Sequence, residues 1–238
     1  MQDPTSPRTL VSIPTYNEKD NIESLIEAIL RTDDGLDVLV VDDNSPDGTG
    51  QIADEVARRE PRVRVHHRAG KLGLGTAIME AFSIAFEGNY DYLLNMDGDF
   101  SHHPQYLPTI LETMNEADVV IGSRYVEGGG FVGWGMMRLM MSRCINLYTR
   151  CLLRVPARDC SGAYRCYRLS KIKEIDFGRI RSRGYAFQEE FLYHCHRVGC
   201  RIREIPIMFV NRKQGKSKIN LREAIAAVWT LFITAIWG

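Results

Sequence analysis

Short apolar runs alternate with helix-like spacing along the first half of the chain. The runs, which predict strands, cover residues 9–13, 36–41 and 92–96, with a further short strand expected at residues 63–65. Between them, apolar residues recur three and four positions apart, as on one face of a helix, over residues 22–30, 51–59 and 75–86. Strands that are almost wholly apolar are typical of parallel sheets covered by helices on both faces. The pattern therefore predicts an α/β fold with a mostly parallel central sheet.

The second half continues the alternation less regularly. Helices are expected over residues 104–114, 136–153 and 186–198, and strands over residues 118–122 and 164–167. Residues 202–210 predict a further strand, and Pro206 places it at an edge of the sheet because proline cannot donate to the ladder. Residues 126–135 contain five glycines, so we expect a mobile loop there.

The composition fits one globular domain, with or without a C-terminal appendage. The 238 residues carry 30 basic and 30 acidic side chains, a balance that gives no indication of nucleic-acid binding. The six cysteines form no C-x-x-C pair and have no zinc-like spacing, so reduced thiols are expected. Residues 1–8 lack the apolar stretch of a signal peptide. No uncharged apolar run reaches the roughly 18 residues that predict a membrane span.

Two carboxylates follow directly on one of the predicted strands. Asp97 and Asp99 end the run at residues 92–96, and ligands of open α/β sheets bind outside the carboxyl ends of the strands. Gly98 between them allows a close approach of the backbone to a ligand. Mg²⁺ or Mn²⁺ prefers one or two carboxylates together with water and substrate phosphates, which implies a diphosphate substrate. The alternative is a plain acidic turn, because Asp and Gly are common turn residues.

Glycine-rich and cationic segments elsewhere in the chain limit the kinds of reaction that it could catalyse. Residues 70–75 match neither G-x-G-x-x-G nor G-x-x-x-x-G-K-[ST], so hydride transfer and P-loop chemistry lose their main support; a glycine-rich turn and a ligand contact both remain open there. Arg124 follows the strand at residues 118–122, where a guanidinium can bind phosphate oxygens in a bidentate way. Residues 211–218 contain four cations.

Six motifs occur in an order that resembles the family 2 glycosyltransferases of the GT-A type. They are Ile13-Pro14-Thr15-Tyr16-Asn17-Glu18, Val41-Asp42-Asp43-Asn44-Ser45-Pro46-Asp47, Met96-Asp97-Gly98-Asp99-Phe100-Ser101-His102-His103-Pro104, Gly122-Ser123-Arg124-Tyr125, Asp159-Cys160-Ser161-Gly162 and Arg212-Lys213-Gln214-Gly215-Lys216-Ser217-Lys218. Within that family the chain resembles the dolichyl-phosphate (polyprenyl-phosphate) mannosyltransferases. The resemblance implies a catalytic domain over residues 1–218 and an apolar helix at the membrane interface over residues 219–238.

The resemblance also implies residue roles. The residues implied to hold the nucleotide sugar are Pro14, Tyr16, Glu18, Val41, Asp43, Asp97, Gly98, Asp99, Arg212 and Lys218. Asp97 and Asp99 match the metal-binding Asp-x-Asp motif, and Ser101 falls where some members have a third ligand, Gln. Arg124, Arg138 and Ser142 match positions for the acceptor's lipid phosphate. Asp99, Arg212 and Lys218 are the expected catalytic residues, the last two in a loop that closes on the donor diphosphate.

The implied reaction is metal-dependent, inverting transfer of mannose from GDP-mannose to dolichyl or polyprenyl phosphate. A phosphate acceptor with a second pKa of about 6 is largely dianionic at neutral pH, so no general base is required. We therefore expect structural roles for His102 and His103. The protein would lie peripherally on the cytoplasmic face of a membrane, with residues 136–153 and the C-terminal helix in the interface and a small membrane subunit as a possible partner. The alternative for the C-terminal helix is packing in the core.

Other functions remain open at this point. A polyprenyl-phosphate glucosyltransferase that uses a UDP-sugar shares the same motifs. Relatives with protein or polysaccharide acceptors would more often need a carboxylate base. A catalytically silent nucleotide-sugar-binding subunit is disfavoured because Asp97, Asp99, Arg124 and Arg212 are all present.

Overall fold

A seven-stranded sheet forms the centre of the molecule. The computed structural model describes residues 7–211 and 229–234. In spatial order, the strands are β3 (Val63–His67), β2 (Leu36–Asp42), β1 (Thr9–Thr15), β4 (Tyr92–Asn95), β7 (Arg165–Arg168), β5 (Val119–Ser123) and β8 (Ile202–Pro206). Only β7 runs antiparallel to its neighbours, β4 and β5. The predicted α/β fold with a mostly parallel sheet is confirmed. The strand predicted over residues 202–210 is instead two strands: β8 ends at Pro206 and lies at the edge of this sheet, and residues 208–210 belong to another sheet.

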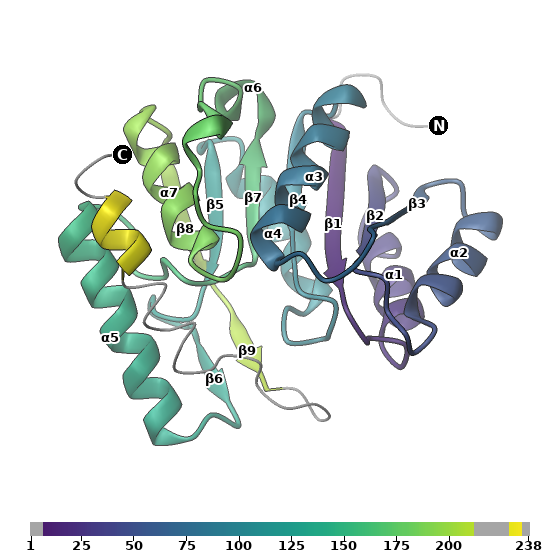
Figure 1. The fold of residues 1–238 in the computed structure, drawn as a ribbon, viewed down its shortest axis with the longest axis horizontal. Coiled ribbons are helices and arrows are strands. Elements are labelled where there is room, and N and C mark those ends of the chain that lie inside the picture. The colour runs from purple at the N-terminus through teal and green to yellow at the C-terminus, as the bar shows by residue number, and fades with distance from the viewer. Residues whose placement is uncertain (1–6, 212–228, 235–238) are drawn as a thin grey trace.

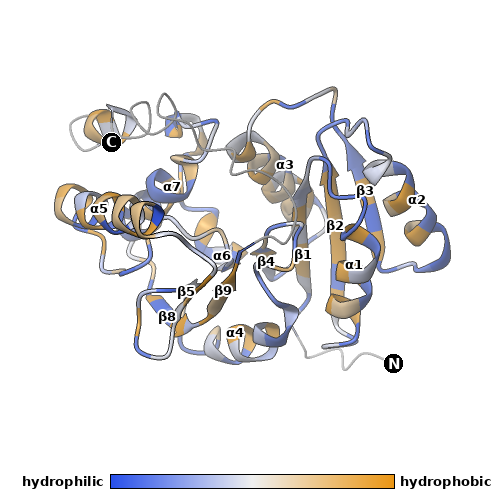
Figure 2. Ribbon diagram, turned by 90° about the horizontal axis from the view of Figure 1, so that it is seen from below, coloured by the Kyte–Doolittle hydropathy of each residue, from blue (hydrophilic) through white to orange (hydrophobic). Residues whose placement is uncertain are grey.

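Helices cover both faces of the sheet (Figures 1 and 2). One face packs against α1 (Ile22–Leu30), α2 (Thr49–Arg59) and α4 (Leu107–Thr113), and the other against α3 (Leu74–Glu87) and α7 (Phe187–Arg197). The remaining helical elements are η1 (Pro104–Tyr106), α5 (Met136–Leu153), α6 (Leu169–Ile172) and η2 (Phe177–Arg179). Each face buries its own apolar cluster, as expected for strands that are apolar on both sides.

The register of the parallel strands brings their polar ends together. Thr15 at the end of β1 pairs with Asp42 at the end of β2, and the backbone N–H of Asp43 donates to the carbonyl of Thr15 at 3.0 Å. The backbone N–H of Met96, just beyond β4, donates to the carbonyl of Ser12. The segments after β1, β2 and β4 therefore lie side by side at one edge of the sheet.

A second, two-stranded sheet lies below the first (Figure 1). Its strands are β6 (Gly130–Val132) and β9 (Met208–Val210), paired in parallel. The expectation of a loop over residues 126–135 is therefore wrong for residues 130–132. Their hydrogen-bond partners come from a strand almost eighty residues later in the chain, so the local glycine content does not reveal the pairing.

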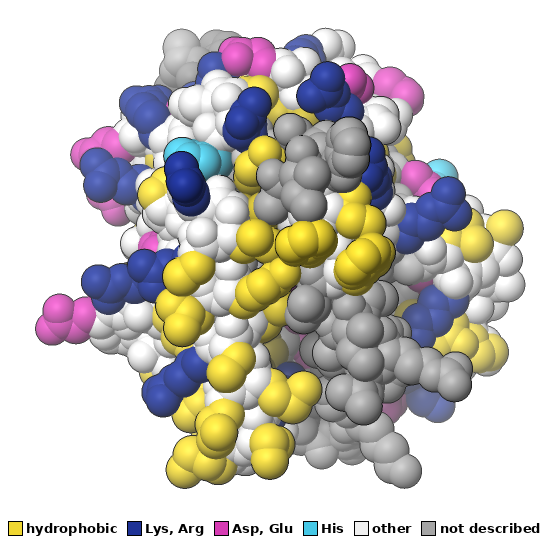
Figure 3. Space-filling view, turned by 60° about the vertical axis from the view of Figure 1, so that its left-hand side comes forward, with side chains coloured by type: hydrophobic (Ala, Val, Ile, Leu, Met, Phe, Trp, Pro, Cys, Tyr) yellow, Lys and Arg dark blue, Asp and Glu magenta, His cyan; other side chains and the backbone are white. Residues whose placement is uncertain are grey.

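Helix α5 and the helical residues 229–234 lie next to each other at one side of the molecule (Figures 1 and 3). Leu231 is fully buried in the cluster that α3 and α7 share, whereas Trp229 and Phe232 are exposed. Among the residues that the structure describes, no helix combines the length and the apolar character needed to span a membrane. The predicted boundary at residue 218 lies outside the described residues.

Candidate active site

A cavity of about 520 Å³ opens at the shared edge of β1, β2 and β4. Most of the side chains expected to hold a nucleotide sugar line it. They are Pro14, Tyr16, Glu18, Asp43, Asp97 and Gly98. The side chain of Val41 is instead fully buried in the apolar core. The sheet edge thus brings together side chains that are up to 84 positions apart in the sequence.

The carboxylate of Asp43 is held from behind by Arg68. The Arg68 guanidinium is almost completely buried and donates to Asp43 through Nη1, to Glu80 through Nε at 3.1 Å and to Thr76 through Nη2. Burial raises the pKa of Asp43, and the attraction of Arg68 opposes this shift. Arg68 lies directly after β3, and the sequence analysis did not assign it a role.

The Asp97-Gly98-Asp99 turn packs closely against the segment after β1. A Cβ atom on Gly98 would lie 3.1 Å from the Thr15 side chain and 3.4 Å from that of Glu18, so glycine permits the close approach. Asp97 lines the cavity with its side chain 27% exposed, whereas Asp99 is only 4% exposed. Asp99 Oδ1 accepts hydrogen bonds from the backbone N–H of Ser101, at 3.1 Å, and from its hydroxyl.

These residues fit a divalent ion that is shared with a substrate. Within the described part of the chain, no group of three or more His, Cys, Asp or Glu side chains is arranged to hold a metal by itself. Two carboxylates beside an open cavity match the preference of Mg²⁺ and Mn²⁺ for few protein ligands plus phosphate oxygens and water. The Ser101 hydroxyl, which donates to Asp99, orients that carboxylate; its role as a third ligand stays a prediction.

His102 packs behind the turn as a neutral imidazole. Its Nδ1 accepts a hydrogen bond from the backbone N–H of Asp97 at 3.1 Å, and its ring stacks on Tyr164 at 5.0 Å between centroids. Burial lowers the pKa of His102, although the nearby carboxylates of Asp97 and Asp99 oppose this shift. His103 accepts from the N–H of Gln105 at the start of η1. Both contacts are those of structural residues.

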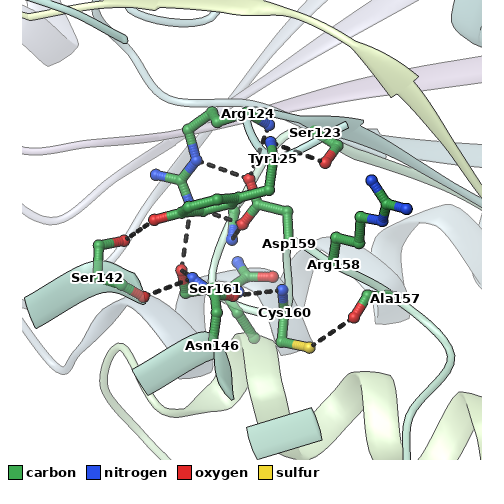
Figure 4. A network of polar contacts seen from close by, with 12 residues as sticks. Ser123, Arg124, Tyr125, Ser142, Asn146, Ala157, Arg158, Asp159, Cys160 and Ser161 are labelled. Carbon is green, nitrogen blue, oxygen red and sulfur yellow. Dashed lines mark hydrogen bonds and ion pairs between the residues drawn. The ribbon is translucent and has the colours of Figure 1, made fainter. Parts of the chain in front are cut away.

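Arg124 forms a bidentate ion pair with Asp159 (Figure 4). Nε and Nη2 donate to the two carboxylate oxygens at 2.7 and 2.6 Å, and the Arg124 backbone N–H also donates to Asp159 at 3.0 Å. Burial by itself would raise the pKa of Asp159 and lower that of Arg124. Their mutual attraction outweighs burial, so the pKa of Asp159 is lowered and that of Arg124 is raised. The structure thus shows this guanidinium engaged by Asp159, a partner that the sequence analysis did not pair with it.

Ser142 belongs to the same polar network (Figure 4). It accepts a hydrogen bond from the Tyr125 hydroxyl at 2.7 Å, and its carbonyl accepts from the side chain of Asn146 at 2.8 Å. Asn146 Oδ1 accepts from the backbone N–H groups of Cys160 and Ser161. The network fixes the middle of α5 against the Asp159 loop.

Arg138 lies one turn before Ser142 on α5. Its Nη1 donates to Asn211 Oδ1 at 3.0 Å, and its guanidinium carbon lies 3.9 Å from the centroid of the Trp134 ring. Arg124 lies 5.6 Å from the same centroid. The three residues expected at the acceptor phosphate are therefore gathered at one place. The expected catalytic cations Arg212 and Lys218 lie outside the described residues.

Residues 181–186 and Thr230 also line the cavity, and the sequence analysis did not assign them to the site. Lys71 and Gly73 line it too, so the glycine-rich segment whose ligand contact was left open borders the cavity. The buried carboxylate of Glu190 accepts from the backbone N–H groups of Arg181 and Ser182 at 3.0 and 2.7 Å. The Thr234 hydroxyl donates to the same carboxylate at 3.4 Å. Glu190 lies in the first turn of α7, where acidic residues are common, so nothing in the local sequence points to its contacts with these backbone N–H groups.

Replacing Glu189 with glutamine is expected to change the pH dependence of stability. Burial raises the pKa of Glu189 from 4.5 to about 7, although Arg165 opposes the shift. Between these two pH values Glu189 keeps its proton in the folded state but loses it in the unfolded chain. The free energy of unfolding is therefore highest below pH 4.5 and falls as the pH rises to about 7. Glutamine stays neutral, so the variant should be more stable than the wild type at pH 8 by up to about 3 kcal/mol, with almost no difference at pH 4.5. Urea unfolding at both pH values measures this; an equal difference at both would contradict it.

Comparisons with known proteins agree with this geometry. The family model described as Glycosyl transferase family 2 matches residues 10–176. An undecaprenyl-phosphate mannosyltransferase from Micrococcus luteus is 44% identical, over 97% of this chain and 96% of the relative. A polyprenol monophosphomannose synthase from Mycolicibacterium smegmatis is 41% identical, over 97% of this chain and 87% of the relative.

Solved structures share the fold at lower identity. The glucosyl-3-phosphoglycerate synthase of Mycobacterium tuberculosis, solved with Mn²⁺, uridine diphosphate and glucosyl-3-phosphoglycerate, superposes with a TM-score of 0.69 at 20% identity. The match covers 97% of this chain and 79% of the other. At this identity the likeness concerns the fold alone.

Proposed function

Because the chain belongs to glycosyl transferase family 2, we propose that it transfers mannose from GDP-mannose to dolichyl or another polyprenyl phosphate and releases GDP. The observation that carries the proposal is the similarity, over nearly the whole chain, to two relatives whose names describe polyprenyl-phosphate mannosyl transfer. The geometry supports it, because Asp43 and Asp97 line a cavity at the ends of the parallel strands. The cluster of Arg124 and Arg138 around Trp134 packs against the Asp97 turn through Phe209 and His102.

The residues divide into a donor side and an acceptor side. We assign Pro14, Tyr16, Glu18 and Asp43 to the nucleoside, and Asp97 and Asp99 to the Mg²⁺ or Mn²⁺ ion on the donor diphosphate. A bound divalent ion neutralises charge that develops on the leaving diphosphate. Arg124, Arg138 and Ser142 are assigned to the acceptor phosphate, and Arg212 and Lys218 to the donor diphosphate.

The reaction needs no protein base. An oxygen of the acceptor phosphate forms a bond to the anomeric carbon while the bond from that carbon to the diphosphate breaks, and GDP leaves with the electron pair. A phosphate monoester is largely dianionic at neutral pH, so it attacks without losing a further proton. A single in-line displacement inverts the anomeric carbon and gives a β-linked product from an α-linked donor.

A reconstituted assay tests the donor and the acceptor together. The purified chain would be incubated with vesicles that contain undecaprenyl phosphate, Mg²⁺ or Mn²⁺, and either GDP-mannose or UDP-glucose, and the lipids analysed by mass spectrometry. We expect mannolipid from GDP-mannose only. Glucolipid would move the assignment to a UDP-sugar transferase. No lipid product with either donor, unless a small membrane subunit is added, would contradict activity of the chain alone.

The same vesicles test peripheral membrane contact. A band of exposed apolar side chains runs along α5 onto residues 229–234 (Figure 3) and comprises Met136, Met137, Met140, Met141, Leu147, Trp229 and Phe232. The exposed Arg143 and Arg150 lie on the same helix, as in helices that lie in an anionic membrane surface. We propose that this band contacts the cytoplasmic leaflet. The chain should pellet with anionic vesicles, and loss of pelleting should follow Met137→Ser with Met140→Ser.

A further inference from the structure

The indole of Trp134 lies at the centre of the acceptor-side cluster. Trp134 lies two residues before the start of α5, where the pairing of β6 with β9 brings the chain next to Asn211. Asn211 donates its backbone N–H to the carbonyl of Val132 at 2.9 Å and its side-chain N–H to that of Gly133 at 3.1 Å. The position of Trp134 is therefore set by two segments far apart in the sequence.

The ring is packed on several sides. The Arg138 guanidinium stacks on it at 3.9 Å, Phe131 lies at 4.3 Å between centroids, and Phe209 meets it edge-on at 5.5 Å. A guanidinium over an indole face is a favourable cation–π contact. The ring thus holds the Arg138 side chain in a defined orientation, while its own rotation is restricted by the neighbouring rings.

The indole nitrogen of this packed ring is shielded from solvent. Within residues 7–211 and 229–234, Nε1 has no hydrogen-bond partner. An indole N–H can only donate, and a buried one normally finds an acceptor. The side chains that surround the ring include two arginines, which offer no acceptor. An anion that enters between Arg124 and Arg138 would supply one.

We propose that Trp134 is a further binding residue for the acceptor, with its Nε1–H donating to an oxygen of the polyprenyl phosphate and its ring orienting Arg138. This inference rests on the proposed function. A phosphate dianion offers several acceptor oxygens, so it can take the indole N–H in addition to the guanidinium groups.

The test compares Trp134→Phe with the wild type. Phenylalanine keeps an aromatic ring under Arg138 but has no N–H. Loss of a hydrogen bond to a charged group should raise the KM for farnesyl phosphate about tenfold or more, with little change in kcat. Calorimetric titration should show the same loss of affinity for farnesyl phosphate, while the affinities for GDP and for farnesol stay unchanged. Trp134→Ala, which also removes the support of Arg138, should lose more.

Controls separate this role from a general effect on folding. Tyr90→Phe also removes a buried aromatic donor, since the Tyr90 hydroxyl donates to Asp37 at 2.6 Å near the amino ends of β2 and β4. It should leave the farnesyl phosphate affinity unchanged. An unaltered affinity in Trp134→Phe, or an equal loss for GDP, would overturn the proposal. A wild type that binds farnesyl phosphate but makes no mannolipid would contradict the proposed function instead. If Trp134→Phe lost affinity for inorganic phosphate to the same extent, the site would be one for free phosphate and not for the lipid acceptor.

Discussion

Asp97→Asn is expected to lower kcat by about 100-fold or more with Mg²⁺ or Mn²⁺ present. Asparagine keeps the shape of the side chain but removes the negative charge that we propose to hold a cation at the cavity. Asp97 is the better of the two carboxylates for this test because its side chain lines the cavity and is partly exposed, so the substitution should disturb packing little. Product formation from GDP-mannose over a range of metal concentrations measures the effect.

Chelation and a surface variant complete that experiment. Removal of divalent ions by EDTA should abolish turnover in the wild type, and added Mg²⁺ or Mn²⁺ should restore it. Asp34→Asn serves as the matched control, because that side chain is fully exposed and lies outside the residues that line the cavity. Full activity of Asp97→Asn, or turnover that is insensitive to EDTA, would refute the metal assignment.

Asp159→Asn is expected to lower the free energy of unfolding by about 3–5 kcal/mol, because it leaves the buried guanidinium of Arg124 without its counter-charge. The change also removes the bidentate contact that fixes the orientation of the Arg124 guanidinium. The rate of transfer to the acceptor should therefore fall in the protein that remains folded. Urea unfolding measures the difference in the free energy of unfolding. The dependence of that free energy on urea concentration is taken to be the same for both proteins.

A double-mutant cycle measures the interaction energy between Asp159 and Arg124. Asp159→Asn combined with Arg124→Met should cost less than the sum of the two single changes, because no charge is then left buried alone. Arg201→Met is the control: this arginine also pairs with an aspartate, Asp118, but its side chain is 60% exposed. Exposed pairs contribute little, so the control should lose about 1 kcal/mol or less. Additive losses for Asp159 and Arg124 would show that the two residues are not coupled.

The donor side could be predicted from the sequence because it follows from strand polarity. Asp43 and Asp97 each follow an apolar run, and parallel strands place such residues at one edge. The contact of Gly98 with Thr15 depends on the same rule. The polarity of the parallel strands is enough to bring the segments after β1, β2 and β4 together.

The acceptor side could not be predicted in the same way. The pairing of Arg124 with Asp159 depends on β7, which enters the sheet antiparallel between β4 and β5, and no local pattern encodes that insertion. Pairing of residues 130–132 with β9 likewise joins distant segments through backbone hydrogen bonds. Arg68 was not assigned a role because it lies behind Asp43 and does not line the cavity itself. Glu190 was not assigned one because its partners are backbone N–H groups.

The insertion of β7 also affects the order in which a growing chain can assemble. Strands β4 and β5 are neighbours in the sequence of strands, but β7 lies between them in the sheet. The block of β1, β2, β3 and β4, with Asp43, Asp97 and Asp99, is complete once about the first hundred residues have been synthesised. The block that carries Arg124 is joined to it only after residues 165–168 have left the ribosome. During synthesis, therefore, the half proposed to bind the nucleotide can be ordered well before the half proposed to bind the lipid is in place.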